Sequence, residues 1–420
     1  MSIHRPKGTS DITPETSGDW HRMEGIMRSL CDRYGYGELR TPLFEHTELF
    51  LRGVGETSDI VEKEMYTFMD KGDRSITLRP EGTAPVVRAF VESRAYAQAQ
   101  PTRYYYNGPM FRYSRPQAGR FRQFHQFGAE IFGSSDPVAD AEVILLCMDF
   151  FREVGLKDLC LEINSVGCPD CRPEHRASLQ RFLETVEGDL CETCRRRARE
   201  NPLRVFDCKS DACQSAVREA PVVTRHLCGQ CRDHFGEVCR LLDAAGLTWR
   251  LNETLVRGLD YYTRTAFEVT VEGIGAQGSI GGGGRYDFLV EEIGGPPTPG
   301  VGFAVGLERV LRAMEVQGNV PFSRKGPDVF LAPVSSGERD ACFLLMQRLR
   351  GEGIRAQMEV MDRSLKAQFR YADRQGFSHV LVLGSEEVDS GRCTLRDMEK
   401  NQETVLTVEE LLMYLKEDRG

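Results

Sequence analysis

The sequence predicts an α+β protein in which strand hairpins, a cysteine-rich segment and a C-terminal α/β part follow one another along 420 residues. Three observations carry this prediction. Residues 103–133 contain two strand-like runs joined by a short basic loop. Residues 328–384 alternate between strand-like and helix-like runs, which is typical of a small α/β domain. Between these parts, nine of the 14 cysteines fall within residues 168–239.

Composition limits the class of protein. The length suffices for two or three domains, and a hydrophobic fraction of 40% suffices for a sizeable core. No apolar run is long enough to span a bilayer, and the polar start MSIHRPKGTSD lacks a secretory signal. We therefore expect a soluble cytoplasmic protein without a membrane partner. The net charge of -9 argues only weakly against a nucleic-acid partner, because a local basic surface can still bind phosphates.

Local patterns predict the elements in order. The first part contains a helix (20–34), a strand interrupted at Pro42 (34–46), a helix that begins in the SSDP segment (134–155) and a strand (159–167). Strands with a Gly-rich hairpin follow at residues 249–287. Residues 318–327 are rich in Gly, Pro and Ser and predict a linker. Strands and helices then alternate at residues 328–333, 338–352, 355–360, 364–376 and 379–384. GIGAQG (273–278) matches a dinucleotide-binding fingerprint, but SIGGGGRYD follows instead of a helix, so we interpret it as a hairpin turn.

The second strand-like run of residues 103–133 carries the main functional signal. Alternate side chains of a strand face opposite sides, so one face of this run displays Phe124, Gln126, Gly128 and Glu130. An aromatic ring, an amide, a gap and a carboxylate suit a small polar ligand better than a core. Cations near this face, which an anionic ligand requires, come from the preceding strand and loop: Arg112, Arg115 and Arg120.

This pattern resembles motif 2 of the class II aminoacyl-tRNA synthetases. VRGLDYYTRTAFEV (256–269) and GGGGRYD (281–287) resemble the two signature motifs of histidyl-tRNA synthetases, and GVGFAVGLERV (300–310) resembles class II motif 3. TLRPEGTAPVVRA (77–89) and RPKGTSDITP (5–14) also fit that family. The resemblance covers nearly the whole chain in the family's order, which makes it far more specific than any single motif.

The resemblance implies an architecture. The fold would be a class II antiparallel sheet flanked by helices, with catalytic parts at residues 1–166 and 248–323, a Cys-rich insertion at 167–247 and an anticodon-binding α/β domain at 327–420. Pro42 matches the proline of motif 1 at the dimer interface, which implies a homodimer. A turn before a strand is an equally good local interpretation of Pro42.

The implied reaction is the ligation of L-histidine to histidine tRNA through a histidyl-adenylate, with ATP and Mg²⁺. Negative charge develops on phosphoryl oxygens in such a reaction, so the site needs arginines that keep their charge. By resemblance, Arg112 contacts the α-phosphate, Arg309 the γ-phosphate and Arg120 a further phosphate, while Phe124 stacks on adenine. Arg257 would bridge the α-phosphate and the histidine carboxylate. The alternative is that these arginines are ordinary surface charges.

The histidine substrate needs partners of its own, because neutral imidazole offers one donor and one acceptor. The family residues with these roles match Glu130 and Tyr262. Acceptors for the substrate ammonium match Glu81, Thr83 and Gln126, and Tyr261 belongs either to the site or to the core. One position departs from motif 2, since Ser114 stands where a glutamate usually contacts adenine. We expect adenine to be held by stacking and backbone groups, with weaker ATP binding.

Contacts with tRNA are predicted at two places. The loop 114–120 resembles the one that meets the acceptor end, which assigns Gln117 and Arg122 to tRNA. In the C-terminal part, a helical spacing of three, four and four predicts one basic stripe: Arg363, Lys366, Arg370 and Arg374. This stripe either contacts phosphates or is a solvated helix face, and the same ambiguity holds for CRRRARE (194–200).

The cysteine-rich segment predicts structural zinc. Eight thiols form four pairs that suffice for two Cys₄ sites, leaving Cys239 over: Cys168 and Cys171, Cys191 and Cys194, Cys208 and Cys213, Cys228 and Cys231. Few large apolar residues accompany them, so metal would replace a missing core. Buried free thiols are the alternative, and redox sensing is a third. The spacing does not say how the pairs combine.

Part of this set of motifs also fits a protein that is not an enzyme. Some proteins similar to histidyl-tRNA synthetases are non-catalytic, histidine-binding regulatory subunits of ATP phosphoribosyltransferase. They typically lack the C-terminal domain and lose catalytic residues. This chain keeps Arg112, Arg257 and Arg309 and has an α/β segment after residue 327, which favours the enzyme.

Overall fold

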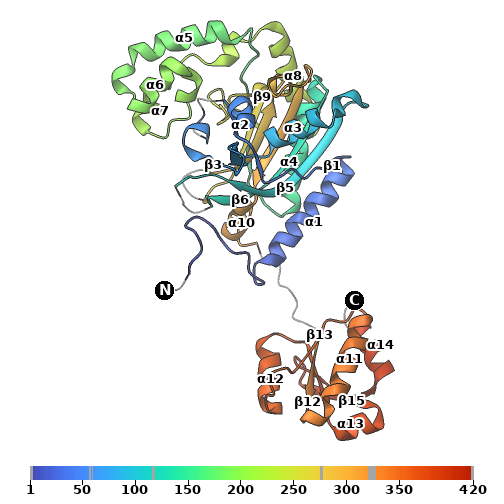
Figure 1. The fold of residues 1–420 in the computed structure, drawn as a ribbon. Coiled ribbons are helices and arrows are strands. Elements are labelled where there is room, and N and C mark those ends of the chain that lie inside the picture. The colour runs from blue at the N-terminus through green and yellow to red at the C-terminus, as the bar shows by residue number, and fades with distance from the viewer. Residues whose placement is uncertain are drawn as a thin grey trace. The chain divides into compact units, whose positions relative to one another are not determined.

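The computed structural model describes residues 3–55, 58, 60–115, 119–274, 278–319 and 328–417. The chain forms two compact units, residues 1–322 and 323–420 (Figure 1). Most of the predicted linker, residues 320–327, lies outside the described residues. Among the described helices, none combines the length and apolar character that a membrane span requires.

The first unit is built on an eight-stranded sheet. Its strands follow in the order β1 (Gly37–Glu38), β5 (Thr102–Phe111), β6 (Gln123–Phe132), β11 (Gly300–Gly306), β10 (Ser279–Arg285), β9 (Thr263–Thr270), β7 (Cys160–Ser165) and β8 (Arg250–Leu251). Only the edge pairs β1–β5 and β7–β8 are parallel. The predicted α+β fold with an antiparallel sheet is therefore confirmed. The GIGAQG segment joins the antiparallel strands β9 and β10, as a hairpin connection does, although residues 275–277 lie outside the described part.

One face of this sheet forms the main hydrophobic core. Four helices pack there, α1 (Ser17–Arg33), α4 (Pro137–Glu153), α8 (Gly229–Ala244) and α10 (Leu307–Val316). Helix α4 starts as predicted, because the Asp136 side chain accepts a hydrogen bond from the Val138 amide and Pro137 occupies the first turn. From β6, the core receives Phe127, Ala129 and Ile131. The alternating residues of β6 consequently face the other side.

That other side is covered by shorter elements. Helices α3 (Thr83–Glu92) and α9 (Leu289–Glu292) pack there around a second cluster of aromatic and aliphatic side chains. Next to α3 lie α2 (Thr47–Val54), the π-helical turn η1 (Ile60–Glu64) and a small antiparallel sheet of β2 (Phe44–His46), β4 (Ser75–Leu78) and β3 (Tyr66–Met69). The strand predicted across Pro42 is in fact two strands in two sheets, because β1 pairs with β5 whereas β2 pairs with β4.

The cysteine-rich segment forms a helical lobe, drawn in green in Figure 1. It contains α5 (Arg172–Thr185), α6 (Glu192–Glu200), α7 (Asp211–Ala216) and three short 3₁₀ turns, and it leads into α8. Its core is small and includes Leu179, Leu183 and Val205 beside Cys194 and Cys213. The cysteines are therefore part of the lobe's core.

The second unit contains a mixed five-stranded sheet. Its order is β13 (Ala356–Met358), β12 (Val329–Pro333), β14 (His379–Leu383), β15 (Arg392–Asp397) and β16 (Gln402–Thr407), accompanied by α11 (Arg339–Gly351), α12 (Leu365–Arg374), α13 (Ser385–Ser390) and α14 (Val408–Glu417). The three parallel strands and the helices α11 and α12 match the predicted alternation. The antiparallel pair β15–β16 and helix α14 were not predicted.

Candidate active site

Glycines on the polar side of the central sheet make room for functional side chains. In the register of β11 and β6, Gly302 lies opposite Glu130, and a Cβ atom at this glycine would overlap the Glu130 carboxylate. On β10, a Cβ at Gly282 would lie 2.9 Å from the Arg257 guanidinium. We call this glycine-lined side of β6, β11, β10 and β9 the polar face.

Glu130 is the most constrained group on the polar face. Its side chain is 0% exposed. One carboxylate oxygen accepts a hydrogen bond from the Thr83 hydroxyl at 2.8 Å, and the other accepts from the Tyr286 hydroxyl. Burial raises the pKa of Glu130 to about 8, and the nearby Glu81 adds to this rise. Tyr286 was missed in the sequence, although it belongs to the GGGGRYD motif.

Acceptors gather beside Glu130. The two oxygens of Glu81 accept the backbone amides of Thr83 and Ala84, each at 2.7 Å, so Glu81 fixes the first turn of α3. Burial raises the pKa of Glu81. Gln126 is 8% exposed, and its buried Oε1 accepts no hydrogen bond from any described residue. A buried acceptor in this state has the chemistry to receive a ligand N–H.

The ring of Tyr106 connects the two sets of acceptors. It lies so close to Gly82 and Gly128 that a Cβ atom at either glycine would overlap it. Gly82 stands between Glu81 and Thr83, and Gly128 stands between Gln126 and Glu130. The start of α3 and the polar face of β6 therefore meet at this ring, which brings the predicted histidine-binding residues of both segments together.

The segment 256–262 is an irregular loop, so the opposite parities of Arg257 and Tyr262 do not separate them. The rings of Tyr261 and Tyr262 have centroids 4.6 Å apart, and Tyr261 meets Tyr286 edge-on at 5.6 Å. All three rings belong to one buried cluster with Tyr106. Burial raises the pKa of the Tyr261 and Tyr262 hydroxyls, which therefore stay protonated donors. Tyr261 is thus a core residue that also borders the site.

Arg257 and Arg309 approach one edge of the polar face from different elements. The Arg257 guanidinium pairs with Glu268 of β9 at 2.9 Å. Glu268 also accepts from the Ser279 hydroxyl at 2.8 Å, and Arg309 of α10 donates to the Ser279 carbonyl. A short chain of polar contacts therefore links the two arginines. Arg309 lies in the first turn of a helix after a strand, as predicted.

Arg112 and Arg120 complete the group of cations. The Arg112 guanidinium lies 5.3 Å from the centre of the Phe124 ring, and its Nε donates to the Pro80 carbonyl at 2.7 Å. Arg120 pairs with Glu64 at 2.7 Å. The pKa of Arg309 is lowered by burial and further by the positive charges of Arg120 and Arg112. The structure thus gathers these arginines, and their mutual repulsion favours a polyanion among them.

The predicted acceptor-end loop is described only in part, because Gln117 lies outside the described residues. Ser114 is buried, and its carbonyl accepts from Arg122 Nε at 3.4 Å. The Arg122 guanidinium covers the exposed Tyr113 ring at 3.8 Å. In the second unit the predicted basic stripe is wrong at one position. Arg363 precedes α12 and packs over the Tyr371 ring at 4.1 Å, so the exposed stripe consists of Lys366, Arg370 and Arg374.

The eight paired cysteines form two groups of four. One group combines Cys168, Cys171, Cys228 and Cys231, and the other combines Cys191, Cys194, Cys208 and Cys213. Within each group the sulfur atoms lie within 4.8 Å of one another. A tetrahedral zinc with Zn–S bonds of about 2.3 Å places its sulfurs about 3.8 Å apart, close to the 3.9 Å between Cys168 and Cys228 and between Cys191 and Cys208. Both groups therefore fit a metal ion, whereas Cys239 packs against the main core.

Backbone amides point at the sulfurs of both groups. The Cys228 amide donates to the Cys171 sulfur, and the Cys191 amide donates to the Cys213 sulfur, each at 3.2 Å. Backbone hydrogen bonds from the Cys194 and Cys231 amides are the largest contribution that lowers the pKa of Cys191 and of Cys228, respectively, to about 7. Burial raises the pKa of the neighbouring thiols of Cys171, Cys194, Cys208 and Cys231. Thiolates are the form that binds metal.

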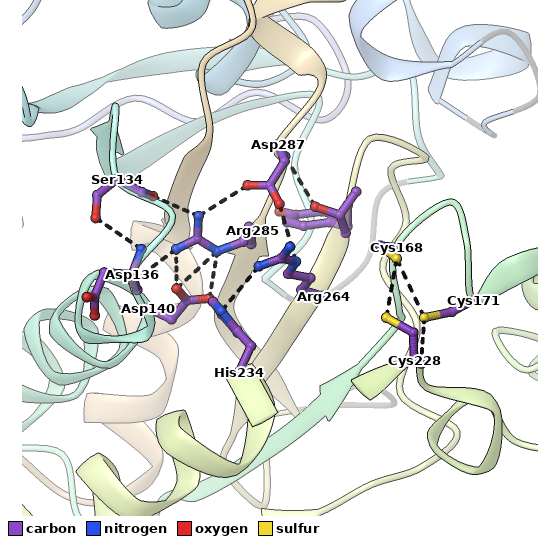
Figure 2. Close-up of polar contacts among 12 residues, drawn as sticks. Ser134, Asp136, Asp140, Cys168, Cys171, Cys228, His234, Arg264, Arg285 and Asp287 are labelled. Carbon is purple, nitrogen blue, oxygen red and sulfur yellow. Dashed lines mark hydrogen bonds and ion pairs between the residues drawn. The ribbon is translucent and has the colours of Figure 1, made fainter. Parts of the chain in front are cut away.

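A buried ionic network anchors the GGGGRYD motif at residues 281–287 (Figure 2). Arg285 is fully buried and pairs with Asp140 of α4, as well as with Asp287 at 3.1 Å. Asp140 also meets His234 of α8 at 3.3 Å, and Arg264 lies 3.4 Å from the other ring nitrogen of His234. Although burial alone raises the pKa of Asp140, the charge of Arg285 lowers it. The network fixes the end of β10 next to Tyr286.

Fold and site together define a class II aminoacyl-tRNA synthetase. A family model described as histidyl-tRNA synthetase matches residues 8–310, and an anticodon-binding-domain model matches residues 328–418. The chain belongs to the histidyl-tRNA synthetase family.

Individual relatives agree over the full length. A histidine–tRNA ligase of Moorella thermoacetica is 56% identical over 414 residues, which is 99% of this chain and 98% of that one. A histidine–tRNA ligase of Desulforamulus reducens is 54% identical over 417 residues, or 99% of each chain. The crystal structure of apo histidyl-tRNA synthetase from S. aureus superposes with a TM-score of 0.83 at 37% identity, covering 99% of this chain and 100% of that one.

Proposed function

We propose that this protein is a cytoplasmic enzyme that ligates L-histidine to histidine tRNA through a histidyl-adenylate, with ATP and its magnesium ion as co-substrate. The observation that carries the proposal is Glu130. It is a fully buried carboxylate that meets Thr83 and Tyr286, beside the open acceptor of Gln126, in a chain of this family. A buried carboxylate is costly unless a ligand or partner uses it, which makes it a marker of a binding site.

Adenylate formation needs positive charge around the phosphates. In the proposed reaction a histidine carboxylate oxygen attacks the α-phosphorus, and the bond to pyrophosphate breaks. Arg112 and Arg257 would stabilise the charge on the α-phosphoryl oxygens, with Arg309 on the γ-phosphate and Arg120 on a further phosphate. Phe124, next to the Arg112 guanidinium, would stack on adenine. The contact between Arg257 and Glu268 supports this role, because a carboxylate partner holds the guanidinium until substrate arrives.

Histidine would be selected by complementary hydrogen bonds. Glu130 in its ionised form accepts the imidazole N–H, and Tyr262 donates to the other ring nitrogen. Glu81, Thr83 and Gln126 receive the ammonium group. The Thr83 hydroxyl donates to Glu130, which leaves its oxygen lone pairs for the ammonium. A substrate without a matching N–H would leave Glu130 without a ligand donor. The enzyme would therefore discriminate strongly against such a substrate.

The tRNA would contact each unit. The loop around Arg122 would meet the acceptor end, with Gln117 as a second contact, and the second unit would bind the anticodon. The exposed stripe of Lys366, Arg370 and Arg374 on α12 supports phosphate contact there. After adenylate formation the histidyl group passes to the terminal adenosine, and AMP leaves.

Histidine-dependent ATP–pyrophosphate exchange, followed by charging of histidine tRNA, tests the proposal. Exchange that requires histidine, together with charged tRNA, is the expected result. Histidine binding without exchange would instead support a regulatory subunit of ATP phosphoribosyltransferase. The anticodon-binding-domain match at residues 328–418 weighs against that alternative.

A homodimer is part of the proposal. The small sheet next to Pro42 exposes several large apolar side chains: Leu43, Phe44, Phe68 and Met69. Of these, Phe44 is 56% exposed and Met69 is 59% exposed. Exposed apolar side chains of this kind are what a second copy of the chain would cover.

We also propose that the cysteine-rich lobe binds structural zinc. Both four-cysteine groups have the donor chemistry and spacing of a Cys₄ zinc site. Zinc would crosslink the lobe and supply no chemistry to the reaction.

A further inference from the structure

The loop 256–262 borders a cavity. This cavity has a volume of about 260 Å³, and its walls come from the loop and from the cysteine-rich lobe. Liquid water occupies about 30 Å³ per molecule, so the space corresponds to roughly eight or nine waters. Because side chains do not fill this space, apolar packing alone does not fix the position of the loop.

Polar contacts from the lobe hold the loop in addition to the packing of its two tyrosine rings. Arg204, which is 6% exposed, donates from Nη1 to the Arg257 carbonyl at 3.1 Å. Asn201 donates to the Asp260 carboxylate at 3.1 Å, and Arg172 donates to the Tyr262 carbonyl. Arg204 thus contacts the backbone of the residue whose side chain pairs with Glu268 on the polar face.

The second four-cysteine group fixes Arg204 in turn. The segment that carries Asn201 and Arg204 runs between Cys194 and Cys208, and these two cysteines belong to the same group. Within the segment, Arg197 donates to the Arg204 carbonyl at 3.2 Å, and Arg204 Nε lies 3.6 Å from Asp207. The Arg204 guanidinium therefore contacts the loop through Nη1 and lies near the Asp207 carboxylate through Nε, which suits a group that positions another.

We propose that Arg204 is a positioning residue for Arg257: it spans from the cysteine-rich lobe to the loop 256–262 and fixes the guanidinium of Arg257 for the transition state. The inference rests on the proposed adenylate function. A guanidinium that enters the reaction must be placed accurately, and a displacement of about 1 Å lowers the rate about a hundredfold. Arg204 acts through the Arg257 backbone and does not itself touch substrate.

The test is a double-mutant cycle in histidine-dependent pyrophosphate exchange. Arg204→Met keeps an unbranched apolar stem but removes the donors, and it should lower kcat about tenfold to a hundredfold, with a smaller change in KM. Arg204→Lys keeps a charged donor and should recover part of the rate. In an Arg257→Ala background, Arg204→Met should change the residual rate less than about twofold, because coupled residues are not additive.

Arg176→Met is the matched control. Arg176 lines the same cavity, but its guanidinium donates to the Glu200 carbonyl within the lobe at 3.0 Å. This variant should exchange at the wild-type rate. Hydrogen exchange of the loop adds a readout that needs no activity, and the amides of residues 256–262 should exchange faster in Arg204→Met than in Arg176→Met.

Unchanged exchange in Arg204→Met, or an equal loss in both backgrounds, would overturn the assignment of Arg204. Should Arg204→Met fail to fold in a thermal melt, the cycle with Arg204→Lys decides by the same criterion. A wild-type protein without pyrophosphate exchange would sink the proposed function, while hydrogen exchange of the loop would still test whether Arg204 fixes it.

Discussion

Glu130 shows how one residue meets two opposing demands. Burial stabilises its protonated form, whereas acceptance of an imidazole N–H requires the ionised form. The hydroxyls of Thr83 and Tyr286 donate to the carboxylate and favour ionisation, but they do not offset burial fully. The result is a carboxyl group with a pKa of about 8 that ionises easily when a donor arrives.

The pH dependence follows from this pKa. In the proposed enzyme kcat/KM for histidine should rise with pH through about 8, and Glu130→Gln should remove that rise. A pH–rate profile from pH 6 to 9 measures it. An identical profile in Glu130→Gln would show that another group titrates.

The same carboxyl group also affects the stability of the protein, which should fall as the pH rises, whereas kcat/KM should rise. The native carboxyl keeps its proton up to about pH 8, whereas the unfolded chain releases it near the ordinary value of 4.5. Unfolding therefore releases a proton between these two pH values, and the free energy of unfolding contributed by this group falls as the pH rises from 4.5 to about 8. Glu130→Gln should make thermal stability less dependent on pH in this window.

At the residue scale, strand alternation predicted the polar side of β6 correctly. Strand alternation in β6 could not find the site residues that come from other elements. Glu268 lies on β9 between core residues and looks like an ordinary strand carboxylate, and the contact between Tyr286 and Glu130 joins positions 156 residues apart. Such contacts depend on the register of the sheet, which one sequence does not reveal.

At the scale of elements, the pairing of β6 with β11 determines the space over the sheet. Gly302→Ala should push the Glu130 carboxylate aside, because the added Cβ would overlap it. We expect histidine affinity to fall by at least about tenfold, in line with the effect of small misplacements. Calorimetric titration with histidine measures this loss.

Gly236→Ala is the control for that substitution. A Cβ atom at Gly236, within α8, meets no atom within 4 Å. The exchange of glycine for alanine inside a helix should leave histidine binding unchanged and stabilise the protein slightly. Normal histidine binding in Gly302→Ala would contradict the assigned position of Glu130.

The cysteine-rich lobe should depend on metal. We expect two zinc ions per chain, one for each four-cysteine group, and partial unfolding of the lobe when zinc is removed. Metal analysis of protein purified without chelator, with circular dichroism before and after chelation, measures both. Absence of zinc with all eight thiols freely titratable would exclude the sites.

Element boundaries show where local patterns fail. The strand predicted to be interrupted at Pro42 already ends at Glu38, and only the tertiary pairing shows that a second sheet begins at Phe44. The basic spacing included Arg363, although α12 begins only at Leu365, after its N-cap Ser364. Strand β16 was missed because its first four residues are exposed and carry no inward apolar pattern.

At the scale of the whole molecule, the exposed sheet next to Pro42 predicts self-association. Sedimentation equilibrium should give twice the chain mass of 47.4 kDa. Phe44→Asp should weaken the dimer, because it places a charge on the apolar surface that a second copy would cover. A wild-type mass of one chain at micromolar concentration would contradict the dimer.

The proposed reaction depends on Arg112, Arg257 and Arg309, which three separate segments bring to the polar face. The most direct measurement is the rate of histidine-dependent pyrophosphate exchange in Arg257→Gln and Arg309→Gln, with histidine binding measured alongside. We predict that each variant loses at least about a hundredfold in rate, the effect of removing one charge-stabilising group, and that Arg309→Gln still binds histidine. Exchange at the wild-type rate in both variants would contradict the proposed role of these arginines.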